Sequence, residues 1–215
     1  MENKKTIFIL LIALLLFIVL TVLVVTENTP VQAFNHAIYA PIARLINPTL
    51  TTAATLTGNL THWYTYTPII FILLIIPSTR IKIGVPLAIA LSISALTGPI
   101  ILKNILAIER PNINPLIDIG GFGYPSGHSI NAAVFFGMCA IMVLRYSTNK
   151  SLKIGLTAFA IISIFLVGLS RIYLGVHTVT DVIGGYIAGI VVICGVILIE
   201  KRLNNTLFAH TEASE

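Results

Sequence analysis

Residues 7–25 read IFILLIALLLFIVLTVLVV, a run of nineteen residues without a charge. A helix needs about 20 mostly apolar residues to cross the hydrocarbon core of a bilayer, so this run predicts a membrane-spanning helix. A secretory signal peptide is the alternative, because Lys4 and Lys5 precede the run and residues 31–33, VQA, resemble a cleavage site. The apolar core of a signal peptide is only about 7–15 residues long. We therefore expect an uncleaved first helix.

The composition of the whole chain agrees with a membrane protein. Of its 215 residues, 56% are hydrophobic and 10% are charged, and the mean hydropathy is +0.96. A soluble domain carries about 25% charged residues, which argues against a soluble enzyme, a disordered chain and a nucleic-acid binder. The thirteen basic residues are scattered and form no basic stripe. Cys139 and Cys194 lie in apolar runs without metal-ligand or disulfide spacing, so we expect both to be small packing residues.

Further apolar segments predict an all-α fold with six transmembrane helices in one bundle. After residues 7–25, the expected spans are 64–76, 83–102, 129–144, 154–169 and 182–199. Pro99 should bend the outer end of the third span. Gly185 and Gly189 have the GxxxG spacing that lets helices approach closely. We expect residues 1–203 to form one membrane domain and residues 204–215 to form a flexible cytoplasmic tail.

The segments between the first three spans carry mixed signals. Residues 30–58 combine Pro, Asn and Thr with scattered apolar residues, which indicates an outer loop that lies partly on the membrane surface. We expect this loop to shape the mouth of any pocket there. Residues 62–66, HWYTY, follow as an aromatic cluster typical of a membrane–water boundary. Residues 77–82 predict a short polar turn.

The distribution of basic residues predicts the orientation of the helices, because cytoplasmic segments of membrane proteins are enriched in Lys and Arg. Nine of the thirteen basic residues lie at the termini or in the loops after the second and fourth spans, which places both termini in the cytoplasm. These nine are Lys4, Lys5, Arg80, Lys82, Arg145, Lys150, Lys153, Lys201 and Arg202. The four on the outer side are Arg44, Lys103, Arg110 and Arg171. Since outer segments should be poor in such residues, we infer that a site at the outer helix ends requires positive charge.

The first candidate motif is residues 103–111, KNILAIERP. Lys103 and Arg110 are seven residues apart, which is two helical turns, so we expect them on one face of a helix. Two cations on one face can bind one anion. A pair of basic residues that snorkel from a helix end to the membrane surface explains the pattern equally well.

The second motif is residues 124–129, YPSGHS, a tight turn before the fourth span. The N-terminus of a helix presents free backbone N–H groups and the positive end of the dipole, which favours phosphate binding. Ser126 can add a hydroxyl donor, and His128 can supply a proton. A simple N-cap turn is the alternative explanation.

The third motif is residues 170–181, SRIYLGVHTVTD. Arg171 can donate to two oxygens of one phosphate. His177 and Asp181 are four residues apart and would be neighbours on a helix. A carboxylate beside Nδ1 fixes the tautomer and leaves Nε2 free as a nucleophile. The alternative is a helix-capping Asp beside a structural His.

As a set, the motifs KX6RP, PSGH and SRX5HX3D resemble the signature of the type 2 phosphatidic acid phosphatase (PAP2) superfamily, and every defining position matches. The predicted six spans make the chain similar to the membrane lipid-phosphatase branch rather than to the soluble members. The resemblance implies a lipid phosphate phosphatase that uses no cofactor.

The resemblance also implies a role for each motif residue. His177 attacks phosphorus and forms a phosphohistidine, and Asp181 orients the ring. His128 protonates the leaving oxygen and then helps to activate water for the second step. The remaining motif residues bind the phosphoryl oxygens: Lys103, Arg110, Ser126, Gly127 and Arg171.

The carboxylates argue against a metal-dependent phosphatase. The chain contains only two aspartates, Asp118 and Asp181, so a DxD aspartyl-phosphate nucleophile is impossible. A two-metal site would need several carboxylates and histidines close together, and the sequence predicts none. His36, His62 and His210 belong to no motif, and we expect them to be structural or surface residues.

A site at the outer leaflet suits a phosphate head group whose lipid tail stays in the bilayer. The resemblance implies lipid phosphates of a bacterial plasma membrane, and we favour undecaprenyl diphosphate or a broad range. Phosphatidylglycerophosphate and phosphatidate stay open, as does phosphotransfer to an acceptor other than water. A non-enzymatic anion or lipid transporter is a further alternative, but it would want charged or broken-helix positions near the bilayer midplane.

Overall fold

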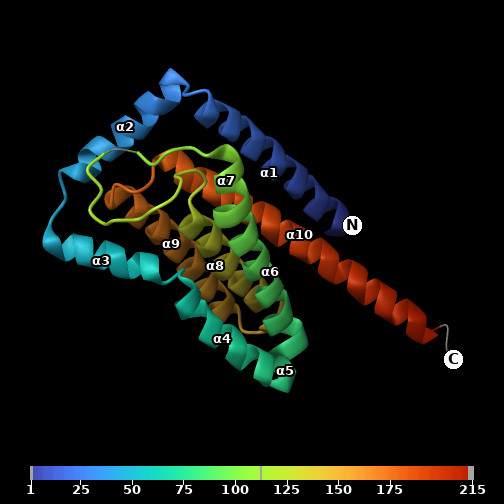
Figure 1. Cartoon of the computed structure of the whole chain (residues 1–215). Helices are drawn as coiled ribbons and strands as arrows, with labels where there is room; N and C mark the ends of the chain where they lie inside the picture. The colour runs from blue at the N-terminus through green and yellow to red at the C-terminus, as the bar shows by residue number, and fades with distance from the viewer. Residues whose placement is uncertain (1, 112, 213–215) are drawn as a thin grey trace.

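The structure is a computed structural model that describes residues 2–111 and 113–212, with side chains for 3–98, 100–111 and 113–202. All regular structure in these residues is helical (Figure 1), which confirms the predicted all-α class. The helices are α1 (Glu2–Val25), α2 (Thr29–Ala43), α3 (Pro48–Asn59), α4 (Trp63–Ile75), α5 (Pro77–Thr79), α6 (Val85–Ala95), α7 (Lys103–Leu106), α8 (Gly127–Tyr146), α9 (Lys150–Tyr173) and α10 (Val179–Glu212), with π-helical segments η1 (Arg80–Gly84) and η2 (Leu96–Leu102).

Five helical stretches of the described chain are long and apolar enough to cross a membrane. They are Asn3–Val25, Pro77–Leu106, Gly127–Tyr146, Lys150–Tyr173 and Val179–Arg202. The expected second span corresponds to α4, which has 13 residues. At 1.5 Å per residue this helix is about 20 Å long, short of the roughly 30 Å hydrocarbon core. The prediction of six spans is therefore not confirmed by helix length.

The direction of the helices shows how α4 fits into the bundle. The start of α1 and the end of α10 lie at the same end of the bundle (Figure 1), and the two helices pack along each other. Helix α4 starts beside the N-terminus of α8, where the His62 and His128 rings are 6.3 Å apart, and leads to α5 at the opposite end. It thus makes the same passage as α8 and α10, although it is shorter. The cytoplasmic placement of the termini stays a prediction.

Most of the chain between α1 and α4 is helical, so the irregular structure expected at 30–58 is wrong, whereas the outer placement of this segment stays a prediction. Asn28 and Asn47 are N-caps whose side chains accept hydrogen bonds from Val31 N and Leu50 N, and each helix has Pro in its first turn. Asn at the N-cap followed by Pro is helix-start chemistry. The same residues that indicated a loop therefore begin α2 and α3.

Two further segments that were expected to be irregular, residues 77–82 and the start of the tail, are helical. Residues 77–82 are not a turn, because α5 and η1 begin there and continue into α6. Pro99, where a bend was expected, lies in η2, in which the helix changes from α to π hydrogen bonding. Helix α10 continues to Glu212, so the segment expected to be a tail is helical through that residue. Its flexibility and the domain boundary at residue 203 stay predictions.

Helix α8 lies at the centre of the core, between α6, α9 and α10. Its crossing with α10 is close, as the GxxxG spacing predicted. A Cβ at Gly185 would lie 2.7 Å from the Ser126 carbonyl oxygen, and one at Gly189 would lie 2.6 Å from the Ala133 Cβ. Cys139, which packs against this core, and the buried Cys194 are both free thiols. The close crossing brings the N-termini of α8 and α10 together.

We expect Gly185→Ala to lower the free energy of unfolding by about 1–3 kcal/mol, because the new methyl group would overlap backbone atoms that cannot rotate away. Gly195→Ala is the matched control on the same helix, since a Cβ added there would meet nothing within 4 Å. The thermal midpoint in detergent measures both. Equal midpoints for the two variants would contradict the close crossing.

Candidate active site

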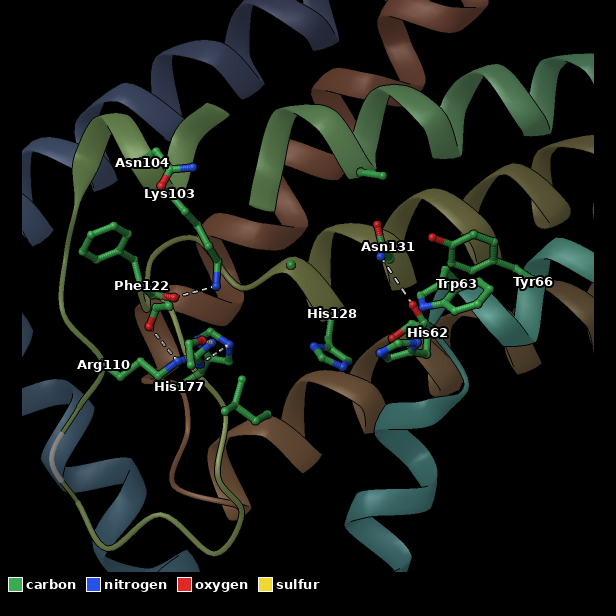
Figure 2. Close-up of a pocket in the computed structure, with 16 residues that line it drawn as sticks. His62, Trp63, Tyr66, Lys103, Asn104, Arg110, Phe122, His128, Asn131 and His177 are labelled. Carbon is green, nitrogen blue, oxygen red and sulfur yellow. Dashed lines mark hydrogen bonds between the residues drawn. The ribbon is translucent and has the colours of Figure 1, made fainter. Parts of the chain in front are cut away.

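The residues of the three motifs meet at one end of the bundle, around a cavity of about 460 Å³ (Figure 2). Five of the eight predicted site residues line it: Lys103, Arg110, Gly127, His128 and His177. The other three, Ser126, Arg171 and Asp181, are buried beside it. The structure thus brings the motifs together, although the first and the third are 59 positions apart in the chain.

His177 and Asp181 form a buried pair. His177 is 2% exposed, and its Nδ1 lies 3.3 Å from Asp181 Oδ2. The same carboxylate oxygen accepts a hydrogen bond from Thr178 N at 2.8 Å, while Asp181 N donates to Thr178 Oγ1 at 3.2 Å. This reciprocal pattern is a capping box at the start of α10. Asp181 therefore caps the helix and orients the histidine at the same time, so both explanations of the sequence apply.

The contact arises differently from the expected one. His177 and Asp181 do not share a helix, because α10 begins at Val179 and His177 precedes its N-cap. The carboxylate turns back toward the chain that enters the helix, as an N3 residue of a capping box does. The spacing of four residues predicted the right pair for the wrong reason.

Arg110 covers the other ring nitrogen of His177. Its Nη1 lies 3.2 Å from Nε2 and donates to the Val176 carbonyl at 2.9 Å. A guanidinium only donates hydrogen bonds, so Nε2 carries the lone pair and Nδ1 carries the proton that Asp181 accepts. This tautomer presents a nucleophilic nitrogen to the cavity.

Burial lowers the pKa of His177 to about 4. Its hydrogen bond with Asp181 and the charge of that carboxylate act in the opposite direction, whereas Lys103 and Arg110 lower the pKa further. The ring is therefore neutral at pH 7, which is the state that a nucleophile requires.

Acid should destabilise the fold through this ring. Between pH 6.5 and 4 the unfolded chain binds a proton on His177 and the folded chain does not, so stability falls as the pH falls. Because one pKa unit corresponds to about 1.4 kcal/mol, the loss should reach about 3 kcal/mol. We expect the thermal midpoint of His177→Gln, which cannot titrate there, to decline less over this range. Parallel declines of the two proteins would contradict the lowered pKa.

Lys103 and Arg110 reach the cavity from different kinds of structure. Helix α7 ends at Leu106, and Ala107 adopts the left-handed conformation with φ 48°. The expectation that the two cations share a helical face is therefore wrong. Lys103 Nζ donates to the Phe122 carbonyl at 2.6 Å, and Arg110 donates to Gly120 and Gly121 carbonyls. Both cations are thus held by carbonyl groups of residues 120–122, in the irregular segment between α7 and α8.

The N-terminus of α8 lines the cavity that contains His128 and His177. Ser126 is its N-cap and is fully buried, with Oγ accepting from Ser129 N at 3.4 Å and from Ser129 Oγ at 3.1 Å. Ser126 N donates to the Asp181 carbonyl at 3.0 Å, which ties the starts of α8 and α10 together. Gly127 and His128 follow and line the cavity. Ser126 therefore caps α8, as the alternative explanation predicted. The backbone N–H groups beside it belong to the N-terminus of the helix, which favours an anion.

Arg171 lies at the end of α9 and is 3% exposed. Its guanidinium donates to the Ala54 carbonyl of α3 at 3.3 Å and to Ser170 Oγ at 3.2 Å. A Cβ at Gly58 would overlap this guanidinium, so glycine at that position is what allows α3 to pack against it. Arg171 therefore does not line the cavity, and its hydrogen bond to Ala54 connects the end of α9 to α3.

The structure adds cavity residues that the motifs did not indicate. His62, Trp63 and Tyr66 at the start of α4, and Asn131 of α8, line the wall beyond His128. His62, which we expected to be a structural or surface residue, lies in this wall. No spacing rule connects it to His128, which lies 66 positions later in the chain. His36 is exposed on α2, and the side chain of His210 lies outside the described residues.

The described side chains contain no group of three His, Cys, Asp or Glu residues that could hold a metal ion. The cavity contains the cations Lys103 and Arg110 beside the histidines His128 and His177, and their role toward an oxyanion stays a proposal. Independence from metal stays a proposal.

Comparison with known proteins identifies the family. Residues 81–205 match the PAP2 superfamily. Phosphatidylglycerophosphatase B of Bacillus subtilis is 39% identical over 92 residues, which are 42% of this chain and 45% of that protein. An undecaprenyl-diphosphatase of Sulfolobus acidocaldarius is 34% identical over 132 residues, 59% of each chain. The matches thus span about half of the length of these curated relatives.

Two solved structures extend the similarity to the whole fold. The crystal structure of the transmembrane PAP2-type phosphatidylglycerolphosphate phosphatase from Bacillus subtilis superposes with a TM-score of 0.78 at 27% identity, covering 90% of this chain and 96% of that one. LpxE of Aquifex aeolicus has a TM-score of 0.60 at 25% identity, with 78% and 95% covered. With its apolar helices and its matched motif region, the chain belongs to the PAP2 superfamily, and it has the fold of a transmembrane member of that superfamily.

Proposed function

We propose that this protein removes a terminal phosphate from lipid head groups through a covalent phosphohistidine on His177. The observation that carries the proposal is the geometry of that ring, with Nδ1 held by Asp181 and Nε2 directed toward a cation in the cavity. A buried, neutral imidazole with Nδ1 held by a carboxylate and an unprotonated Nε2 is arranged for nucleophilic attack.

In the first step, the lone pair of His177 Nε2 forms a bond to phosphorus as the bond from phosphorus to the leaving oxygen breaks. His128 gives its proton to that oxygen. The His177 ring becomes positively charged, and Asp181 stabilises it. Lys103, Arg110 and the N–H groups at Gly127 bind the phosphoryl oxygens, with Ser126 and Arg171 supporting them from behind. Arg110 moves from Nε2 to the phosphate as the substrate enters.

In the second step, His128 takes a proton from water as the water oxygen attacks phosphorus. The bond between phosphorus and Nε2 breaks, its electron pair returns to His177, and inorganic phosphate leaves. His128 recovers in this step the proton that it gave to the leaving oxygen, so both histidines return to their starting protonation. No metal takes part in this scheme, because histidine and the cations supply the nucleophile and the charge stabilisation.

We place the site at the extracytoplasmic side of a bacterial plasma membrane, with α4 as a sixth, short crossing. The far end of the bundle carries the basic residues Arg80, Lys82, Arg145 and Lys150, as cytoplasmic ends do. A lipid phosphate can then present its head group to the cavity while its chain stays in the leaflet. Undecaprenyl diphosphate or a broad set of lipid phosphates is our preferred substrate, with phosphatidylglycerophosphate and phosphatidate as alternatives.

The test is phosphate release by the purified protein in detergent, with EDTA present. The panel contains undecaprenyl diphosphate, phosphatidylglycerophosphate, phosphatidate and a soluble diphosphate. Release from at least one lipid, unaffected by EDTA, is the expected result. Activity that EDTA abolishes and a divalent metal restores would contradict the metal-free scheme. Absence of release from every lipid would contradict the phosphatase itself.

A further inference from the structure

The wall of the cavity beyond His128 is more polar than a lipid tail requires. It is formed by the α3–α4 junction and the start of α4, with Thr61, His62, Trp63 and Tyr66, and by Asn131 from α8 (Figure 2). The mechanism proposed above uses none of these residues. A polar atom that is buried without a hydrogen bond is costly, and this wall contains one in the ring of His62.

The ring of His62 holds hydrogen-bonding capacity that the protein does not use. The residue is the N-cap of α4, yet its side chain makes no capping hydrogen bond. Its Nδ1 is buried without a partner among the described residues. The ring stacks on Tyr64 with centroids 4.3 Å apart. Its backbone is fixed, because His62 N donates to the Asn59 carbonyl at 3.1 Å and Thr65 N donates to the His62 carbonyl at 2.9 Å.

Asn131 places a second donor on the same wall. Its Oδ1 accepts a hydrogen bond from the fully buried Ser94 at 2.8 Å, which leaves Nδ2 directed toward the α3–α4 junction. One Nδ2 hydrogen reaches the Thr61 carbonyl at the long distance of 3.4 Å. An amide nitrogen has two hydrogens, so one remains for a ligand.

The direction of the reaction places the leaving group against this wall. In an in-line displacement, the leaving oxygen departs opposite to the attacking nitrogen. His177 attacks from one side, and His128 must contact the leaving oxygen to protonate it. In Figure 2 His128 lies between His177 and His62, and the His128 and His62 rings are 6.3 Å apart. The group attached to the leaving oxygen therefore meets His62 and Asn131.

We propose that His62 and Asn131 form a subsite for a second phosphate, carried by the leaving group. This rests on the proposed function and narrows its substrates to lipids with two phosphates. In a lipid diphosphate, the second phosphate is bonded directly to the leaving oxygen. In a glycerol-bridged bisphosphate, such as phosphatidylglycerophosphate, it is a few atoms farther away. A lipid with one phosphate offers no anion at this position.

The test compares kcat/KM for two-phosphate and one-phosphate lipids in the same detergent. Undecaprenyl diphosphate and phosphatidylglycerophosphate are the two-phosphate arms, and phosphatidate is the reference. His62→Phe keeps a ring to stack on Tyr64 but removes both nitrogens, whereas His62→Gln restores a donor. Because hydrogen bonds to charged groups are strong, the ratio should fall about 10- to 100-fold in the Phe variant and recover in part in the Gln variant. His36→Phe makes the same change on α2, outside this wall, and should keep the wild-type ratio.

The outcomes separate this proposal from the proposed function. If the wild type hydrolyses no lipid, the proposed function fails. If the wild type is active but prefers phosphatidate, the subsite is overturned. It is also overturned if His62→Phe loses activity equally on both classes of lipid. Should His62→Phe fail to fold, inhibition of the wild type decides the question. Methylenediphosphonate should then inhibit at about tenfold lower concentration than inorganic phosphate, and equal potency would overturn the subsite.

Discussion

His177→Ala is expected to abolish turnover, with a fall in kcat on the order of 10⁶, as for the loss of a catalytic nucleophile. Among the described histidines, only His177 has one ring nitrogen held by a carboxylate and the other directed toward a cation. Phosphate release from the best lipid of the panel measures the effect. The cations of the cavity should still bind phosphate, so misfolding does not explain the loss if the variant retains affinity for inorganic phosphate.

His177→Gln is the companion variant, because its amide can still bond to Asp181 and fills most of the buried space. It should be as inactive as the alanine variant but closer to the wild type in thermal midpoint. After brief incubation with lipid carrying a radioactive phosphate, the wild type should hold protein-bound label and both variants should not. Turnover near the wild-type rate in either variant would rule out the covalent scheme.

Asp181→Asn should lower kcat by about 10³- to 10⁴-fold, in analogy with the loss of the histidine-orienting carboxylate in serine proteases. The amide oxygen can still accept from Thr178 N, so the capping box and the fold should survive. The amide cannot supply the negative charge that stabilises the ring in the phosphohistidine. Single-turnover phosphate release measures the chemical step directly.

Thr178→Ala is the matched control for this substitution. It removes the hydroxyl that accepts from Asp181 N but keeps the carboxylate beside His177. The loss of a cap should lower stability by about 1 kcal/mol, with a far smaller effect on the rate than Asp181→Asn. If the two variants lost activity equally, Asp181 would act through the fold and not through its charge.

Composition and local spacing determined much of this protein in advance. An apolar excess over 215 residues indicates that the chain is surrounded by lipid, so it predicts membrane helices whatever their packing. His177 and Asp181 are four residues apart, so their pairing could be predicted from neighbours in the chain. A helix start near residues 124–129 could also be predicted, although α8 begins at Gly127, within the expected turn. The Asn and Pro residues of α2 and α3 were misleading, because capping and loop formation use the same side chains.

Tertiary structure alone decided which distant segments share the cavity. The left-handed turn at Ala107 sends Arg110 away from the helix of Lys103 and back onto His177. The close packing at Gly185 joins the starts of α8 and α10, α3 packs on Arg171, and the His62 ring lies 6.3 Å from that of His128. These contacts depend on the direction in which each helix leaves its turn and on how near two backbones can approach. Neither quantity is encoded by spacing within a motif, so the second wall of the cavity could be recognised only in the folded chain.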